Sequence, residues 1–573
     1  MSKIIKDLKI KIDDNLEEHL AWLEPNYGEY RILRQSVDAR QKHSPHFVYT
    51  LELSEKNEKL KTEPFELERI DFNANKHKKP IVIGTGPAGL FAALRLVEQG
   101  VPCLLFERGS ESSERIKGIN KFWRYGQLDP KNNVCYGEGG AGLYSDGKLI
   151  TRIKSEHIPY VLNRLVQFGA PAEIQWLSNP HVGSDKIRRV IPKIRDYLRS
   201  QGCEIFYDSQ ITELIYGDRC IKGVKTIQGD IFHSDHVILS TGHSAEDMLN
   251  HLIESNVFVE GKSFAMGLRV EHPQKLINKI QYREFSEHPK LGSANYKLVH
   301  HDKSSGIGVY SFCMCPGGYV LSSGTEKDAL VVNGMSNFNR NSPYANAAIV
   351  VSIQHDKLFP GDLMGGMKLR KQLETDAFKA IQNAGGTKEL PAQNLMSFMT
   401  GQAKKNNLNH GTSSPSGIKP IMLSEMLPKF MYQKIKEGIE KFNANMKGFI
   451  SEEAQLYGVE SRTSCPLRVT RSDESLESIS HAGLYPCGEG AGYAGGINAA
   501  DGRAHRYRFT CRLGDRQDAR RRRGHFDREF VGFQFKEDLI RFHARAAGDE
   551  PFGDAAFGHG IAGGGNGYGN GHR

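Results

Sequence analysis

The stretch KKPIVIGTGPAGLFAALRLVEQGVPCLLFERG, residues 78–109, decides the fold of the central part of the chain. The apolar residues 81–83 predict a short buried strand, a helix follows to about Gln99, and residues 103–106 predict a second strand. The glycines that join the first strand to the helix have the spacing G-x-G-x-x-G. This order of strand, glycine turn, helix and strand predicts a Rossmann-like unit in a parallel sheet.

The glycine spacing has a chemical explanation. Gly84 permits the tight turn, Gly86 lets the backbone approach a pyrophosphate, and Gly89 lets the helix lie close to the strand. Glu107 ends the second strand, where a carboxylate accepts hydrogen bonds from ribose hydroxyls and disfavours the 2′-phosphate of NADP. We therefore predict that this unit binds FAD or NAD. No second motif of this kind follows between a strand and a helix, so a separate nicotinamide domain is not expected.

Two later segments have related features. Residues 229–245, GDIFHSDHVILSTGHSA, follow a meander of short alternating strands, and their buried strand ends in Thr241-Gly242, where small residues let the backbone pass near a cofactor. In YGEGGAGLYSDGKL, residues 136–149, the glycines leave the backbone open to a ligand. Ser145 and Asp146 there are expected either to hydrogen-bond the ligand or to cap the next helix.

These segments, taken with four others, resemble the bacterial FAD-dependent dehydrogenases of the glutathione-reductase-like FAD superfamily. The other four are FAMGLRVEHPQ (264–274), SFCMCPGGYV (311–320), GVESRTSCPLR (458–468) and LYPCGEGAGYAGGI (484–497). The resemblance covers about residues 25–502 and implies that the cofactor is FAD.

The resemblance also implies that a late glycine-acid pair, Gly488-Glu489, returns to the cofactor. Glycines leave room for the backbone there, and the N-terminus of the following helix stabilises negative charge on a reduced flavin. The predicted cofactor-binding residues are Gly84, Gly86, Pro87, Ala88, Gly89, Glu107, Arg108, Gly139, Gly140, Ser145, Ile211, Thr241, Gly242, Gly488, Glu489, Gly490, Gly495 and Gly496.

The predicted fold class is α/β, with a Rossmann-like FAD-binding domain, an inserted α+β domain and an N-terminal module. Residues 1–75 predict a ferredoxin-like α+β module, as the resemblance also implies. The FAD-binding domain is expected to comprise residues 79–262 plus 460–502, and the inserted domain residues 263–459. Because a cleft between domains excludes water, the inserted domain is expected to hold the substrate pocket.

Two cysteines in CMCPGG are candidates for catalysis. We expect Cys313 and Cys315 either to be structural or to place one thiol near the flavin as a nucleophile or redox partner. No partner C-x-x-C exists for a zinc site, so no metal is predicted.

The other candidates are charged or titratable. Arg269 and Glu271 lie on one face of a predicted strand and are expected to pair, while His272 is a candidate acid or base. His243 follows the Thr-Gly turn and is a candidate flavin-proximal group. Arg462 is a candidate to hold an anionic substrate.

Composition limits the class of protein. The 573 residues are too many for one hydrophobic core, and no run of 18 or more apolar residues could span a bilayer. The N-terminus has neither signal-peptide nor transit-peptide character, so a cytoplasmic location is expected. The nine scattered cysteines are consistent with reduced thiols.

The character of the chain changes after Gly502. Residues 503–573 contain 13 arginines and one lysine, whereas the rest of the chain favours lysine. In the family that the chain resembles, an apolar helix closes the domain here. The tail is therefore either a basic disordered segment able to contact nucleic acid or the product of a shifted reading frame or fusion, and we favour the second interpretation.

The sequence favours an FAD-dependent oxidoreductase that passes hydride between the flavin and an unidentified small molecule. NADH or NADPH is a candidate diffusible reductant. The alternatives are an FAD-dependent RNA-modifying enzyme, suggested by the net charge of +9, and a non-catalytic flavin-binding protein. A small-molecule partner is expected, with no membrane partner and with nucleic acid contacted only through the tail; the sequence does not predict the oligomeric state.

Overall fold

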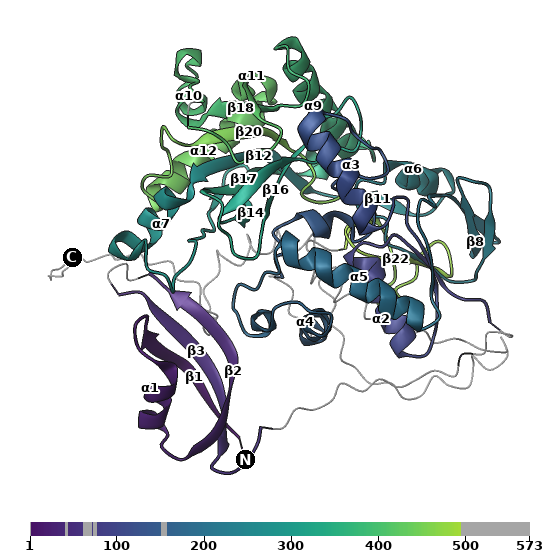
Figure 1. The fold of residues 1–573 in the computed structure, drawn as a ribbon. Coiled ribbons are helices and arrows are strands. Elements are labelled where there is room, and N and C mark those ends of the chain that lie inside the picture. The colour runs from purple at the N-terminus through teal and green to yellow at the C-terminus, as the bar shows by residue number, and fades with distance from the viewer. Residues whose placement is uncertain are drawn as a thin grey trace, which may run out of the picture.

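The structure is a computed structural model, and it describes residues 2–40, 44–60, 72, 77–149, 157–408 and 410–493. These residues form an N-terminal α+β module, an α/β domain and a C-terminal α+β domain, shown in purple, blue and teal to green in Figure 1. The predicted α/β class with an FAD-binding type of fold is confirmed. The tail of residues 503–573 lies outside the described residues, as do Gly495 and Gly496.

The N-terminal module is a three-stranded antiparallel sheet with one helix, in the strand order β1-β3-β2. Its elements are β1 (Lys3–Lys11), α1 (Leu16–Leu23), β2 (Tyr27–Asp38) and β3 (His46–Glu55). The side chain of Asn15 caps α1 by accepting from Glu17 N, and Leu20 buries the helix against the sheet. The described residues of this module include no second helix or fourth strand, so the ferredoxin-like fold stays a prediction.

The α/β domain is built on a five-stranded parallel sheet, in the order β22-β10-β4-β5-β6. Its strands are β4 (Ile81–Ile83), β5 (Leu104–Phe106), β6 (Glu204–Phe206), β10 (Val237–Leu239) and β22 (Leu484–Pro486). The chain runs outward from β4 through β5 to β6 and then crosses back to β10 on the other side of β4. Ligands of open α/β sheets bind where the strand order reverses in this way, outside the carboxyl ends of the strands.

Helices cover this sheet because its central strands are apolar on both faces. The helical elements are α2 (Pro87–Glu98), α3 (Ser112–Tyr125), η1 (Gly140–Tyr144), α4 (Ile158–Gln167), η2 (Ala172–Gln175), α5 (Ser184–Ser200) and α6 (Glu246–Glu254). The predicted meander is a separate antiparallel sheet of β7 (Ile211–Gly217), β8 (Cys220–Thr226) and β9 (Ile231–His233). Figure 1 shows α2 and α5 side by side, and α2 contacts β4 and β10 of the sheet.

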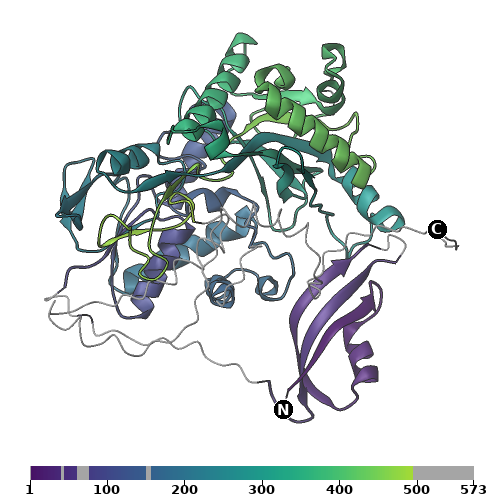
Figure 2. The same cartoon turned by 180° about the vertical axis from the view of Figure 1, so that it is seen from behind.

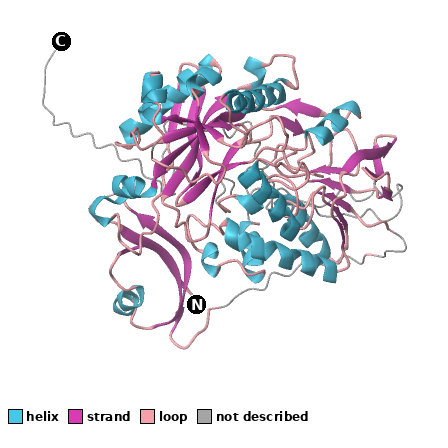
Figure 3. Cartoon of the chain, turned by 45° about the horizontal axis from the view of Figure 1, so that its top comes forward, coloured by secondary structure: helices cyan, strands magenta, loops and turns pink. Residues whose placement is uncertain are grey.

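The C-terminal domain contains a seven-stranded sheet, in the order β13-β14-β17-β12-β20-β18-β19. Its strands are β12 (Phe264–Pro273), β13 (Val299–Asp302), β14 (Ile307–Cys315), β17 (Tyr344–Ile353), β18 (Leu390–Asn394), β19 (Ile418–Pro420) and β20 (Gln455–Glu460). Figure 3 shows these strands as a twisted fan with helices along one side. Gly438 of α12 (Lys429–Asn445) lies so close to the sheet that a Cβ there would be 2.5 Å from Val309 Cγ1.

The remaining elements surround this sheet. They are α7 (Gln274–Tyr282), η3 (Arg283–Phe285), β15 (Gly318–Ser322), β16 (Val332–Ser336), α8 (His355–Leu358), α9 (Gly365–Asn383), α10 (Leu395–Thr400), η4 (Ala403–Lys405) and α11 (Leu423–Met426). Two short strands, β11 (Val259–Gly261) and β21 (Leu467–Val469), pair where the chain crosses between the two domains.

The three parts contact one another in several places. Gln35 of β2 exchanges backbone hydrogen bonds with Trp176 and Ser178 of the α/β domain, both of 2.8 Å. Asp13 accepts a hydrogen bond from His288 of the C-terminal domain. Figure 2 shows the N-terminal module, in purple, at one corner of the molecule. Among the described residues, no helix has the length and apolar character needed to cross a membrane.

Candidate functional site

The turn after β4 is fixed by contact with the end of β10. Gly84 has φ +98°, and a Cβ there would be 2.4 Å from the carbonyl oxygen of Ser240. A Cβ on Gly89 would be 1.9 Å from the carbonyl oxygen of Gly84. The Ser240 hydroxyl donates to the carbonyl of Ile83 at 2.7 Å. Gly84 and Gly89 are therefore required by the packing of the chain itself.

Gly86 is different, because the fold does not require it. It has φ −69°, and the nearest atom to a Cβ there would be Gly140 Cα at 3.8 Å, an ordinary contact distance. Gly140 faces it from η1 with φ +55°. Gly139 N donates to the carbonyl of Thr85 at 3.0 Å, which holds the two backbones together. Two glycines thus face each other beside the N-terminus of α2, where the first backbone N–H groups have no partner within the helix.

Glu107 is buried and joins three loops. Its Oε2 accepts from Thr85 N at 3.0 Å and from Thr85 Oγ1 at 2.9 Å. Its Oε1 accepts from Gly109 N at 3.1 Å and from Gly137 N at 3.0 Å. The carboxylate therefore holds these loops together at the end of β5, and its contact with the ribose hydroxyls stays a prediction. The neighbouring Arg108 pairs with Asp247 at 2.9 Å.

The late glycine segment meets the same turn. Gly488, with φ +75°, lies so close to α2 that a Cβ would be 2.9 Å from Ala88 Cβ. A Cβ on Gly490 would be 2.4 Å from the carbonyl oxygen of Gly242. Pro87, the first residue of α2, begins the helix at this point. Ile211 is instead buried in the hydrophobic core beneath the meander.

Five segments therefore meet at the carboxyl ends of β4, β5, β10 and β22. They are residues 84–89, 107–109, 137–140, 241–242 and 488–490.

A buried ionic network joins this site to the C-terminal domain. Arg462 donates from Nε and Nη2 to Glu374 at 3.0 and 2.7 Å, and from Nη1 to Ser244 Oγ at 3.1 Å and Thr325 Oγ1 at 2.7 Å. Both charged groups are at most 9% exposed. The structure thus gives Arg462 partners within the protein, in place of the predicted anionic substrate.

His243 is part of the same region. Arg370 donates from Nη1 to the carbonyl of His243 at 3.2 Å. Desolvation, together with the guanidinium groups of Arg370 and Arg462, lowers the pKa of His243 to about 3. Its imidazole is therefore neutral at physiological pH, and it lies directly beside the Thr241-Gly242 turn.

The segment after η1 forms a second connection between the domains. Ser145 Oγ donates to the carbonyl of Gly142 at 2.9 Å and closes the local turn. Asp146 is buried and accepts from Arg340 at 3.0 Å and from the hydroxyl of Ser336. Both side chains are thus used in other contacts. Among the described residues, the expectation that Ser145 and Asp146 cap the next helix is therefore wrong.

The two cysteines of CMCPGG lie in different environments. A β-bulge between Phe312 and Cys315 interrupts the pairing of β14 with β17. Cys313 is exposed there with φ +44°, whereas Cys315 is buried and its thiol lies 3.3 Å from the carbonyl of Cys313. Burial raises the pKa of Cys315 to about 12, so this thiol stays protonated and is unsuited to act as a nucleophile. Desolvation also raises the pKa of Cys313, against the positive charges of Lys148 and Arg269, but its exposure leaves it a candidate.

The expectations for β12 are wrong, because this strand is central in its sheet and buried on both faces. Arg269 pairs with Glu460, at 2.8 and 3.0 Å, and not with Glu271. Glu271 instead accepts from the hydroxyl groups of Ser413 and Tyr457.

His272 has no access to a ligand. Its Nε2 donates to the carbonyl of Phe449 at 2.8 Å, and the side chain is fully buried. Burial lowers the pKa of His272 to about 4. Its role as an acid or base is therefore contradicted by its position in the core.

The comparisons with known proteins match two parts of the chain. Residues 79–260 match an FAD binding domain, and residues 263–463 match the family described as "FAD-dependent protein, C-terminal domain-like". An uncharacterized protein from Clostridium beijerinckii is 37% identical over 515 residues, which cover 87% of this chain and 96% of that protein.

The chain belongs to this family of FAD-dependent proteins. The predicted cofactor, FAD, is confirmed. The use of NADH or NADPH stays a prediction, as do the individual site residues.

Solved structures similar to this FAD-dependent protein share little sequence with it. CtdE in complex with FAD is 11% identical, covering 75% of this chain and 83% of that chain, with a TM-score of 0.30. L-proline dehydrogenase from P. horikoshii is 11% identical, covering 75% of this chain and 91% of that chain, also with a TM-score of 0.30. Neither likeness is close enough to indicate a substrate.

The described residues fit FAD. The N-terminus of α2, with Gly86 and Gly140 beside it, leaves backbone N–H groups and space for a pyrophosphate. Glu107 ends β5, and Gly488 brings the late glycine segment to the same helix. Among the described residues, no group of His, Cys, Asp and Glu side chains is arranged to hold a metal ion.

Glu107→Gln is expected to lower both stability and FAD content. In either orientation the amide NH₂ would face at least one backbone N–H donor, so the free energy of unfolding should fall by about 2 kcal/mol. Urea denaturation and the flavin absorbance per protein measure the two effects. The matched control is Glu114→Gln, because Glu114 is exposed in an ion pair with Lys117. Unchanged stability and flavin content in Glu107→Gln would contradict the role of the carboxylate.

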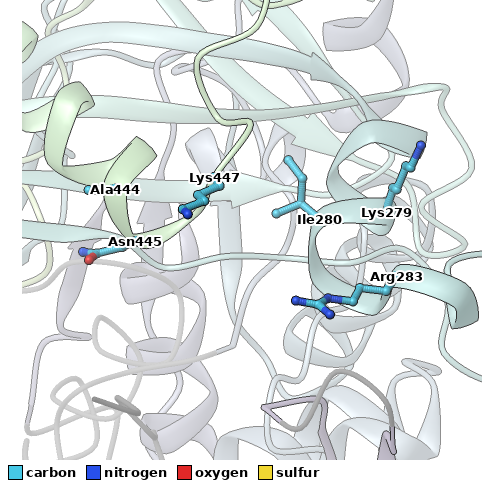
Figure 4. Close-up of a pocket in the computed structure, with 6 residues that line it drawn as sticks. All are labelled: Lys279, Ile280, Arg283, Ala444, Asn445 and Lys447. Atoms are coloured by element: carbon cyan, nitrogen blue, oxygen red, sulfur yellow. The ribbon is translucent and has the colours of Figure 1, made fainter. Parts of the chain in front are cut away.

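A pocket elsewhere in the C-terminal domain is not part of this site. It lies between the ends of α7 and α12 and is lined by Lys279, Ile280, Arg283, Ala444, Asn445 and Lys447 (Figure 4). Both helices end there, and the carbonyl groups of helix C-termini favour nearby cations. This explains the basic side chains without a ligand.

Proposed function

We propose that this protein is an FAD-dependent oxidoreductase that transfers hydride between the flavin and a small molecule bound between the α/β domain and the C-terminal domain. The observation that carries the proposal is the meeting of five separate segments around the N-terminus of α2, with the C-terminal domain joined to the same region. When bound, the flavin supplies a two-electron centre that gives or accepts hydride.

The side chains between the domains have a positioning role in this proposal. Arg462 and Glu374 fix the C-terminal domain against Ser244, two residues after the Thr241-Gly242 turn. Asp146 fixes it against the glycine-rich segment through Arg340. Such buried polar contacts hold a reaction site in one geometry and exclude water from it.

Cys313 and Lys148 support a substrate surface at this junction. The Lys148 ammonium donates to the carbonyl of Met314, so it lies beside the bulge that exposes Cys313. Lys148 is 22% exposed in its side chain and belongs to the segment that begins with the cofactor-facing glycines. The ammonium also pairs with Asp146 at 3.8 Å, and its exposed part can contact a negatively charged group of a substrate.

The proposal is tested by following the flavin absorbance near 450 nm without oxygen while NADH, NADPH and small organic anions are added in turn. We expect one of them to bleach the flavin, with recovery on admission of oxygen or an artificial acceptor. The opposite outcome is a flavin that is bleached by dithionite and by none of the candidate reductants. That outcome would indicate a structural cofactor and would contradict the proposal.

Cys313→Ala should slow the reduction of the flavin by that reductant at least about tenfold if the thiol contacts the reacting molecule. FAD content should not change, because Cys313 lies outside the five cofactor segments. Rapid-mixing absorbance gives the rate. Cys220→Ala is the matched control, since Cys220 is a half-buried cysteine in the meander. Equal rates of flavin reduction in the two variants would mean that Cys313 does not contact the substrate.

A further inference from the structure

Two buried cysteines lie side by side at the edge of the parallel sheet. Cys103 directly precedes β5 and Cys203 directly precedes β6, and the register of these strands pairs Leu104 with Glu204. The two Sγ atoms are 3.5 Å apart, and Cys103 N donates to Cys203 Sγ at 3.4 Å. Both residues are free thiols with at most 5% exposure.

We propose that Cys103 and Cys203 are a modification site, a thiol pair that a hydroperoxide oxidises to a disulfide. Neighbouring strands are about 4.8 Å apart, within the range of Cα separations that disulfides span. The sulfur atoms must approach by about 1.5 Å to reach the length of an S–S bond, which small rotations about the Cα–Cβ bonds can supply.

The surroundings make Cys203 the attacking thiol. Its sulfur accepts from the N–H and the thiol of Cys103, and these hydrogen bonds lower the pKa of Cys203. Lys79 adds positive charge, because its ammonium donates to the carbonyl of Gly202 at 3.1 Å and to Glu204 at 2.8 Å. Burial raises the pKa of Cys103, so it supplies the second thiol in its protonated form.

The reaction balances with a peroxide as the oxidant. The Cys203 thiolate attacks one peroxide oxygen, the O–O bond breaks, and the leaving hydroxide takes up a proton to give water and a sulfenic acid. The Cys103 sulfur then attacks the Cys203 sulfur, the S–O bond breaks, and the Cys103 proton goes to the departing hydroxide. Two thiols and one hydrogen peroxide give one disulfide and two waters.

This site is separate from the cofactor site and does not depend on the proposed function. The cysteines stand at the amino ends of β5 and β6, whereas Glu107 stands at the carboxyl end of β5, about 13 Å further along the strand at 3.3 Å per residue. The disulfide would close the chain between Cys103 and Cys203, which includes α3, α5 and the glycine-rich segment. Oxidation should therefore stabilise the α/β domain without reaching the flavin.

The test uses the full-length, FAD-loaded protein. It is treated with hydrogen peroxide, quenched with catalase, unfolded in N-ethylmaleimide and digested without reductant for mass spectrometry. We expect a cross-linked peptide pair containing Cys103 and Cys203, two hydrogens lighter than its parts, and its disappearance after dithiothreitol. Recovery of both cysteines as maleimide adducts, under conditions that oxidise the exposed Cys313, would overturn the proposal.

A second readout separates this disulfide from other oxidation products. Peroxide should raise the Tm by about 5 °C or more, reversibly, because the cross-link closes a long loop. Cys103→Ser and Cys203→Ser should each lose the cross-link and the shift, whereas Cys220→Ser should keep both. If the serine variants fold poorly, alanine variants replace them. A cross-link to another cysteine, or a Tm shift that persists in Cys203→Ser, would also contradict the assignment.

Discussion

Gly86→Ala is expected to remove FAD from the protein while leaving the protein folded. A methyl group there meets no atom of the chain closer than 3.8 Å, and the backbone is already in a conformation open to alanine. It would instead project into the space beside the N-terminus of α2. Losing two charge-assisted hydrogen bonds to a phosphate corresponds to about a 100-fold weaker affinity. The flavin absorbance measures the FAD content, and titration of the apoprotein with FAD measures the affinity.

The control for Gly86→Ala is a glycine variant that is strained but remote. Gly401 ends α10 with φ +71° and has open space around it, so Gly401→Ala should cost about 1 kcal/mol in stability and keep the flavin. Gly89→Ala is a second comparison. It should unfold the domain, because its methyl group would clash with the Gly84 carbonyl. If Gly86→Ala keeps a full complement of FAD, the assignment of the pyrophosphate position is wrong.

Arg462→Ala is expected to produce the largest loss of stability among the variants at the domain junction. It would leave Glu374 buried without its main partner, which typically costs about 3 to 5 kcal/mol. The loss should appear in urea denaturation, and the flavin should dissociate more readily because the turn that carries Ser244 is no longer held.

Two further variants test whether the loss of stability comes from the broken Arg462–Glu374 ion pair. Arg462→Met combined with Glu374→Leu should recover a large part of the loss, because no unpaired charge remains. Lys117→Ala, which breaks the exposed pair with Glu114, should change stability by less than about 1 kcal/mol. A double variant as unstable as Arg462→Ala would mean that the lost contacts with Ser244 and Thr325 matter more than the charge.

The parallel sheet and its glycine turn were predictable because their signals are local. The triplet of apolar residues at 81–83, the glycines after it and the acid at the end of β5 all lie within one short stretch. The late return at Gly488 could be placed only through the family resemblance, since nothing in its own sequence says which strand it joins.

The buried network between the domains was missed because its partners are distant in the sequence. Arg462 lies far along the chain from both Glu374 and Ser244, and Arg269 pairs with Glu460 only because β20 lies next to β12. One signal was present. Arg370 and Glu374 lie one turn apart on the same buried face of α9 as Met367 and Ala377, and charged residues on an apolar face need partners.

The place of β22 determines when the cofactor site can form during synthesis. β10 pairs with β4 on one side and with β22 on the other, yet β22 is made only after the whole C-terminal domain. Domains tend to fold as they leave the ribosome. The α/β domain cannot complete its sheet until β22 is made, so one side of β10 stays unpaired until then. The C-terminal domain therefore has the opportunity to fold first. Residues 488–490, the last of the five cofactor segments, are made after the other four because they follow β22.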